Sequence, residues 1–148
     1  MYRLQDGKLQ VLLAHPGGPF YKNKNNGSWT IPKGEIAPEE DGIEAARREF
    51  TEETGITPCG EFIELGTVKQ KSGKIVHAWA FAGNWDDSRP VTSNTFELEW
   101  PPRSGFKQTF PEVDIAQFFS VPEALEKVNE AQRDFIKRLE MFLNKRSE

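Results

Sequence analysis

The chain has 148 residues and a net charge of −4, so it fits one domain and has no overall basic field for binding long nucleic acid. A domain of this length buries about 68–70% of its unfolded surface, which is enough for a stable core. The one cysteine, Cys59, excludes an internal disulfide and a zinc-binding Cys pattern. No apolar run reaches about 18 residues, and Met1 to Gln10 lacks the apolar stretch of a signal peptide. We therefore expect one cytoplasmic domain, residues 1–148, with no membrane partner.

The first predicted elements lie in the N-terminal third of the chain. Lys8 to His15 contains an apolar run of strand length, which a Pro-Gly-Gly-Pro sequence ends. Trp29 to Ile31 is a second, short strand, stopped by Pro32. Asp41 to Thr54 is predicted to be a helix, because acidic residues near its start suit the helix dipole and Gly55 follows its end, where a left-handed residue belongs.

A strand hairpin is predicted from Phe62 to Lys71 and from Lys74 to Trp85, joined by a turn at Ser72 and Gly73. The second strand alternates large and small side chains. Its large residues are Ile75, His77, Trp79 and Phe81, and its small residues are Val76, Ala78, Ala80 and Ala82. Because small side chains let a helix pack closely on a sheet, we expect both faces of this strand to be covered.

The C-terminal part begins with Asp86 to Pro111, which is predicted to be long and irregular; such segments are usually functional or mobile. Val113 to Ser120 is predicted to be the last strand, followed by a short helix, Pro122 to Val128, and an amphipathic helix, Glu130 to Asn144. We expect the apolar stripe of that helix to pack in the core. The stripe consists of Phe135, Ile136, Leu139, Phe142 and Leu143. Strands flanked by helices predict an α/β fold with a mixed β-sheet between helical layers.

Three acidic residues, Glu49, Glu52 and Glu53, stand at positions i, i+3 and i+4 of the predicted helix and are neighbours on its surface. Like charges at this spacing destabilise a helix by about 0.2–0.5 kcal/mol per pair. A solvated acidic face is the ordinary explanation, but at about 100° per residue Glu49 and Glu53 flank the apolar stripe. Hard divalent cations prefer carboxylate oxygens, so the pattern favours a metal site, with Arg48 in ion-pair reach of Glu52.

The segment around these acids resembles the signature of the Nudix hydrolase family. That signature is Gly, five residues, Glu, seven residues, then Arg-Glu-bulky-any-Glu-Glu-any-Gly-bulky. The matching residues are Gly34, Glu40, Arg48, Glu49, Phe50, Glu52, Glu53, Gly55 and Ile56. With each fixed residue near 5–7% in average usage, a chance match is on the order of one in 10⁹ per start position. The signature is therefore specific.

The resemblance implies an α/β/α sandwich with a mixed β-sheet and hydrolysis of a phosphoanhydride bond in a nucleoside diphosphate derivative. It also implies a Mg²⁺ or Mn²⁺ cofactor. The metal ligands that it implies are Glu49, Glu52, Glu53 and the carbonyl of Gly34. Arg48 would orient a carboxylate, and Glu40 would support the loop. The family normally has a substantial strand before the position of Gln10, so Met1 to Leu4 is expected to supply it, or residues are missing before it.

The general base is predicted to be a carboxylate close to the metal. A bound metal lowers the pKa of a water molecule, and a nearby carboxylate then accepts the proton. Glu52 is one candidate. Glu112 is another, because relatives often place a second acid just before the last strand, and Asp114 is a third choice.

The substrate is less defined by the sequence. Trp29 to Gly34 resembles the segment before the signature in dinucleoside polyphosphate hydrolases, and Lys33 is a candidate phosphate contact. Asn94 to Phe110 interleaves aromatic rings with Arg103 and Lys107, a pattern that suits base stacking with phosphate contact. The same rings could instead pin a long loop to the body. Four other residues are expected to have packing roles or no assigned role: Trp29, His77 and Cys59 in packing, and His15 without a predicted partner.

Several functions remain open. The leading hypothesis is hydrolysis of a small nucleotide, with dinucleoside polyphosphates favoured. The main alternative is a nucleoside triphosphate pyrophosphatase that clears damaged nucleotides. Removal of pyrophosphate from an RNA 5′ end lacks an evident basic track. A catalytically silent nucleotide sensor of the same family would be expected to lose signature acids, and this chain keeps them all. The oligomeric state is left open.

Overall fold

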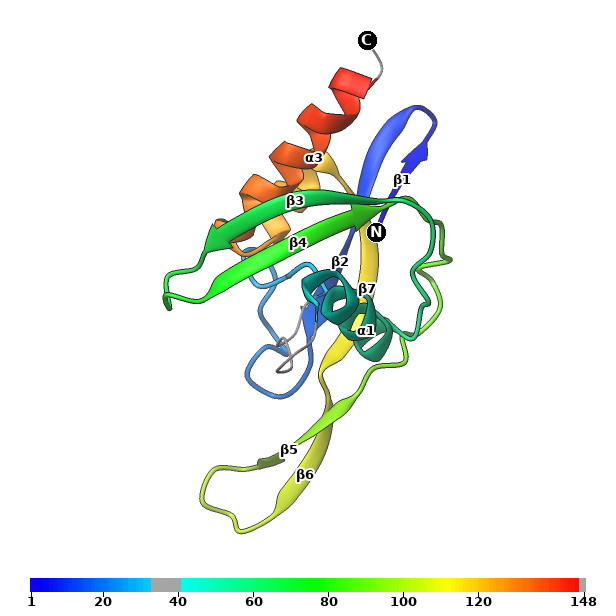
Figure 1. Cartoon of the computed structure of the whole chain (residues 1–148). Helices are drawn as coiled ribbons and strands as arrows, with labels where there is room; N and C mark the ends of the chain where they lie inside the picture. Colours follow the sequence, from blue (N-terminus) through cyan, green and yellow to red (C-terminus); the bar gives the residue numbers. More distant parts are fainter. Residues whose placement is uncertain (33–40, 147–148) are drawn as a thin grey trace.

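The central sheet contains β1 (Tyr2–Gln5), β2 (Lys8–Pro16) and β7 (Val113–Ser120), paired antiparallel in the order β1-β2-β7 (Figure 1). In chain order, the other elements are α1 (Gly42–Thr54), β3 (Phe62–Lys69), β4 (Ile75–Phe81), β5 (Thr95–Glu99), β6 (Lys107–Pro111), α2 (Val121–Lys127), the 3-10 helix η1 (Glu130–Gln132) and α3 (Arg133–Arg146). The structure, a computed structural model, describes residues 1–32 and 41–146. β2 and β7 confirm the predicted strands, and β1 forms where a short first strand was expected. The short strand predicted from Trp29 to Ile31 does not form, since Trp29 and Thr30 make only isolated bridges, to Val128 and Ala14.

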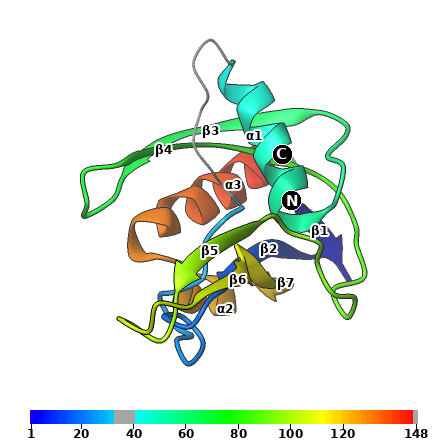
Figure 2. The same cartoon turned by 90° about the horizontal axis from the view of Figure 1, so that it is seen from below.

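β3 and β4 form the predicted hairpin, and a parallel bridge between Tyr2 and Ala82 joins it to β1. The paired strands are all antiparallel to one another, whereas the bridge between Tyr2 and Ala82 is parallel. The arrangement is therefore mixed, as was predicted. On the small-residue face of β4, Val76 and Ala78 pack against Phe135 of α3. α1 and α3 lie on opposite sides of the β3–β4 hairpin (Figures 1 and 2), which gives the expected α/β layering.

The other face of β4 is covered by α1 over only part of its length. Phe81 meets Phe50 of α1 with ring centroids 5.1 Å apart. Gly42 lies so close to Trp79 that a Cβ atom there would be 2.9 Å from the indole ring. Ile75, at the start of β4, is 59% exposed. The prediction that both faces are covered is therefore wrong at this end of β4, because α1 contacts the strand at its other end.

α1 has the predicted bounds to within one residue. It ends because Gly55 adopts a left-handed φ of 78° and donates its N–H to the carbonyl of Thr51. Its buried residues include Glu53 as well as Phe50. Part of the acidic cluster thus lies within the packed face of the helix, which agrees with the prediction that these acids border the core.

The segment Asp86 to Pro111 was predicted to be irregular, and this prediction is wrong for its second half. Its second half forms the antiparallel hairpin β5–β6, which projects from the body (Figure 1). Phe96 and Leu98 are half-buried and alternate with the exposed Glu97 and Glu99, which is the period-two pattern of a strand. Pro101, Pro102 and Gly105 occupy the turn of this hairpin.

The C-terminal helices follow β7 without a long linker. Ser120 caps the start of α2, because its hydroxyl accepts a hydrogen bond from the N–H of Glu123. Three of the five apolar residues predicted for the last helix are buried in the core: Phe135, Ile136 and Leu139. Phe142 is 39% exposed, so the packed stripe weakens towards the end of α3. In the described part of the chain, the helices are too short or too polar to cross a membrane.

Candidate active site on the acidic helix

Arg48 bridges two of the three signature acids on α1. Its Nη2 lies 3.0 Å from Oε1 of Glu49, and its Nη1 lies 2.9 Å from Oε2 of Glu52. The Glu49 side chain is 13% exposed and that of Glu52 is 35% exposed, whereas Glu53 is buried. The guanidinium fork therefore holds both carboxylates at the border between core and solvent.

The charge balance around Glu49 shows which groups are near it. Burial raises the pKa of the Glu49 carboxyl above its usual value, and the adjacent Arg48 guanidinium partly opposes this shift. The negative charges of Glu52 and Glu112 raise the pKa further. Glu112 therefore lies within electrostatic reach of the helix although it is distant in sequence, and the site concentrates negative charge that a cation would stabilise.

Glu112 is held beside α1 by main-chain hydrogen bonds through Asn94. The N–H of Asn94 donates to the carbonyl of Glu52 over 2.8 Å, and the carbonyl of Asn94 accepts from the N–H of Glu112, also over 2.8 Å. On its other side, the carbonyl of Glu112 accepts from the N–H of Gly17 over 2.9 Å. The structure thus brings the predicted residues Glu49, Glu52 and Glu112 together. Asn94 and Gly17 were missed, since main-chain contacts leave no signal in side-chain chemistry.

Asp114, the third candidate base, has a different partner. Its Oδ1 lies 2.8 Å from Nδ1 of His15, and Nε2 of His15 lies 2.7 Å from the carbonyl oxygen of Lys24. The His15 ring is buried and packs edge-on to Trp29, with centroids 5.2 Å apart. These contacts favour a positioning role for Asp114 over proton transfer, and they give His15 the partner that the sequence did not reveal.

Other predicted site residues lie away from this cluster or outside the description. Lys33, Gly34 and Glu40 fall outside the described residues. Arg103 lies in the β5–β6 turn, at the end of the hairpin that is remote from α1 (Figure 1). Lys107 pairs with Glu99 across the hairpin. The structure therefore does not bring Arg103 or Lys107 beside the acids of α1.

Of the residues expected to pack, Trp29 does so. It is buried, and its ring meets Phe119 with centroids 4.9 Å apart. His77 stacks on Trp79 at 4.0 Å and lies 3.0 Å from Glu64, so it has partners, although 32% of its side chain is exposed. Cys59 is exposed, so its predicted packing role is wrong. Cys59 lies in the irregular segment between α1 and β3, which has no helical or strand period to place its side chain in the core.

A cavity of about 320 Å³ opens beside Glu49, between α1, β2, β4 and α3. Most of its lining is apolar and includes Phe50, Trp79 and Ile136, while Glu49 supplies a carboxylate. Ligand pockets are commonly apolar with a few polar groups that fix orientation. The cavity can therefore receive an uncharged part of a substrate whose charged part meets the helix.

Carboxylates of the acidic helix suit a hard divalent cation. Glu49 and Glu52 offer oxygen donors, the ligand type that Mg²⁺ and Mn²⁺ prefer. Within residues 1–32 and 41–146, no three His, Cys, Asp or Glu side chains already form a group able to hold a metal. The donor chemistry fits. Burial first, and then the negative charges of Glu52 and Glu112, raise the pKa of Glu49, and a bound cation would offset that negative charge.

Known proteins resemble this chain in fold, and a family model matches its sequence. Residues 1–139 match the family model described as the NUDIX domain. The structure resembles a C. elegans Ap4A hydrolase solved as a binary complex, with a TM-score of 0.63, 22% identity, and coverage of 97% of this chain and 93% of that one. It also resembles the NUDIX domain of Shewanella oneidensis NrtR complexed with ADP ribose, with a TM-score of 0.62, 16% identity, and coverage of 96% of this chain and 82% of that one. A third similar structure is the MutT protein of Methanosarcina mazei Go1, with a TM-score of 0.54, 23% identity, and coverage of 96% of this chain and 91% of that one. No curated protein sequence matches the chain.

Proposed function

Because this chain belongs to the Nudix family of phosphoanhydride hydrolases, we propose that it cleaves a dinucleoside polyphosphate or a related nucleoside diphosphate derivative, with Glu112 as the general base. The observation that supports this proposal most directly is the pair of main-chain hydrogen bonds from Asn94 to Glu52 and to Glu112, which holds Glu112 beside Glu49 and Glu52. A proton acceptor and a set of metal-binding carboxylates are the two components that metal-assisted hydrolysis requires.

Hydrolysis splits one P–O–P bond and consumes one water. The water oxygen forms a bond to one phosphorus atom, the bridging oxygen leaves with the other phosphate, and the water proton passes to a carboxylate. Glu112 is a better acceptor than Glu52, because Arg48 already engages the Glu52 carboxylate at 2.9 Å. Arg48 is a positioning residue here, since it fixes the orientation of Glu49 and Glu52.

The ligands proposed for Mg²⁺ or Mn²⁺ are Glu49, Glu52 and Glu53, together with the carbonyl of Gly34. When bound, the cation neutralises phosphate charge and lowers the pKa of the attacking water. The partial burial of Glu49 strengthens its interaction with a cation, since the local dielectric is lower than in water. Lys33 is proposed to contact a phosphate of the substrate.

The cavity beside Glu49 is proposed to receive the nucleoside next to the cleaved bond. Likeness to an Ap4A hydrolase supports a dinucleoside polyphosphate as the substrate. A nucleoside triphosphate pyrophosphatase would use the same catalytic residues, so it is the second candidate. The products distinguish them. A dinucleoside polyphosphate gives two nucleotides, whereas a nucleoside triphosphate gives a monophosphate and pyrophosphate.

The test is incubation of the purified protein with Mg²⁺ or Mn²⁺ and a panel of dinucleoside polyphosphates, nucleotide sugars, canonical and oxidised nucleoside triphosphates and triphosphorylated RNA. Products are identified by mass. Glu53→Gln should abolish cleavage, whereas the matched control Glu44→Gln, an exposed acid on the same helix, should retain it. Tight nucleotide binding by the wild type without cleavage of any panel member would overturn the proposal in favour of a sensor.

A further inference from the structure

Aromatic rings line the β5–β6 hairpin outward from the catalytic region. Phe110, two residues before Glu112, pairs across the hairpin with Phe96, and their ring centroids are 6.0 Å apart. Further out, Trp100 meets Phe20 edge-to-face at 5.4 Å. We call Phe96, Phe110, Trp100 and Phe20 the aromatic track.

The track extends well beyond the acids. Trp100 lies four residues after Phe96, which corresponds to roughly 13 Å along an extended strand. Phe20 is three residues from Gly17, whose N–H binds the carbonyl of Glu112, so its Cα lies within about 11 Å of that of Gly17. Trp100 therefore lies outward from the catalytic region, and Phe20, which contacts Trp100, lies within about 11 Å of the backbone beside Glu112.

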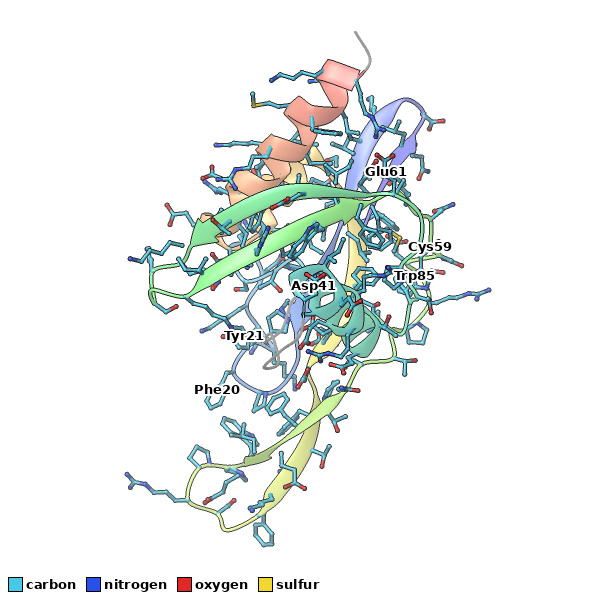
Figure 3. The ribbon with its side chains drawn as sticks, in the orientation of Figure 1. Phe20, Tyr21, Asp41, Cys59, Glu61 and Trp85 are labelled. Carbon is cyan, nitrogen blue, oxygen red and sulfur yellow. The ribbon has the colours of Figure 1, made fainter. Side chains whose placement is uncertain are left out.

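Phe20 belongs to a loop that is fixed in place. Figure 3 shows Phe20 and Tyr21 projecting from the segment after β2, on the side of the β5–β6 hairpin. His15 anchors this loop through the carbonyl of Lys24, and Gly18 lies so close to Phe96 that a Cβ atom there would be 2.8 Å from the ring. The loop is therefore held against Phe96, which with Phe110 forms the inner pair of rings of the aromatic track.

Trp100 is half-buried, but the exposure of Phe20 argues against a packing role alone. Phe20 is 58% exposed although its ring contacts Trp100, so one face remains open to solvent. Tyr21, next to it, is 40% exposed, and Nζ of Lys24 lies 5.5 Å from its ring.

The charge of the same loop suits a phosphate-containing ligand. Residues 17–29 include Lys22 and Lys24 and no acidic residue. On β5, Glu97 and Glu99 alternate with Phe96 and so point to the opposite face of the hairpin. The track therefore combines stacking surfaces with nearby positive charge, which is how proteins bind flexible nucleotides.

We propose that the outer pair, Phe20 and Trp100, binds the second base of a two-base nucleotide whose phosphate chain is cleaved at the acidic helix. This inference rests on the proposed function and narrows its substrate class to dinucleoside polyphosphates. A mononucleotide has no second base, so it gains nothing from the outer pair. The two substrate types therefore separate this role from general effects on catalysis.

The test compares Phe20→Ala and Trp100→Ala with wild type, using diadenosine tetraphosphate and ATP as substrates. Loss of one stacking ring should raise KM for diadenosine tetraphosphate by about 5- to 150-fold, with kcat retained and the kinetics with ATP unchanged. Phe20→Tyr, which keeps a stacking ring, should stay near wild type. The matched control is Phe142→Ala, which removes a partly exposed ring from α3 and should alter neither substrate.

Binding without turnover separates this inference from the proposed function. Calorimetric titration of diadenosine tetraphosphate into the Glu53→Gln protein, with and without Phe20→Ala, should show the same 5- to 150-fold loss of affinity. If wild type cleaves nothing but this loss is seen, the proposed function fails and the second-base site stands. Equal effects of Phe20→Ala on both substrates, or no effect in either assay, would overturn the second-base site.

Discussion

His15 Nδ1 lies 2.8 Å from Asp114 Oδ1, and this contact joins the end of β2 to the start of β7. Because Nε2 also binds the carbonyl of Lys24, replacing the buried ring with Phe removes the partner of two acceptors. Each lost hydrogen bond costs about 0.5–1.5 kcal/mol net, and more where one partner is charged. We expect His15→Phe to lower the free energy of unfolding by about 2 kcal/mol, seen as a lower urea midpoint with an unchanged m-value.

The matched control for this prediction is His77→Phe. His77 also contacts a carboxylate, that of Glu64 at 3.0 Å, but both side chains are substantially exposed. Exposed pairs contribute about 0.2–1 kcal/mol, so the control should lose less than His15→Phe. Equal losses would show that the His15 contacts add nothing beyond those of an ordinary surface pair.

The same contact illustrates what the sequence could and could not predict. The helix of the signature and the β3–β4 hairpin were predictable, because their apolar periods and their glycines are local signals. The partner of His15 is 99 residues away, and no local pattern links the two. The hydrogen bonds that Asn94 makes to Glu52 and Glu112 use main-chain atoms, which every residue has, so the sequence gives no sign of them. The β5–β6 hairpin was missed because the adjacent prolines Pro101 and Pro102 favour an irregular segment and outweighed the alternation of Phe96 and Leu98.

The raised pKa of Glu49 predicts a pH-dependent stability in the absence of metal. Burial and the charges of Glu52 and Glu112 disfavour the ionised carboxylate, so the folded state binds more protons than the unfolded state between the usual glutamate pKa and the raised one. Stability should therefore fall as pH rises through that window. Glu49→Gln should remove this fall and raise the Tm in EDTA above the window. A steeper fall in the variant would contradict the charge balance described for Glu49.

Arg48→Lys tests the positioning role of the guanidinium. Arg48 holds Glu49 and Glu52 at once, at 3.0 and 2.9 Å, whereas a single ammonium cannot reproduce this fork. Loss of a residue that orients metal ligands typically costs about 10–100-fold in metal affinity or activity. We expect the Mg²⁺ concentration for half-maximal activity to rise by that factor. Arg47→Lys, the neighbouring and exposed position, is the control and should leave it unchanged.

Glu112→Gln tests the proposed general base. The amide keeps the size of the side chain but accepts no proton, so kcat should fall by about 10²–10⁴-fold. Binding of a substrate and of Mg²⁺, measured by calorimetry, should be retained. Glu97→Gln removes an exposed acid from the adjacent hairpin and should keep full activity. If Glu52→Gln abolishes turnover with Mg²⁺ binding intact while Glu112→Gln does not, the base is Glu52.

Gly17→Ala tests whether the backbone around Glu112 must stay in place for catalysis. A Cβ atom at Gly17 would lie 2.0 Å from the carbonyl oxygen of Pro111, so the main chain next to Glu112 must move. Overpacking of this kind costs about 1–3 kcal/mol, and the displaced base should also lower kcat. Gly60→Ala is the matched control. Its φ of 89° makes alanine strained, but a Cβ atom there has no neighbour within 4 Å, so stability should fall without loss of kcat per folded molecule. Full activity of folded Gly17→Ala would mean that Glu112 tolerates displacement, which a general base in hydrogen-bond reach of its water does not.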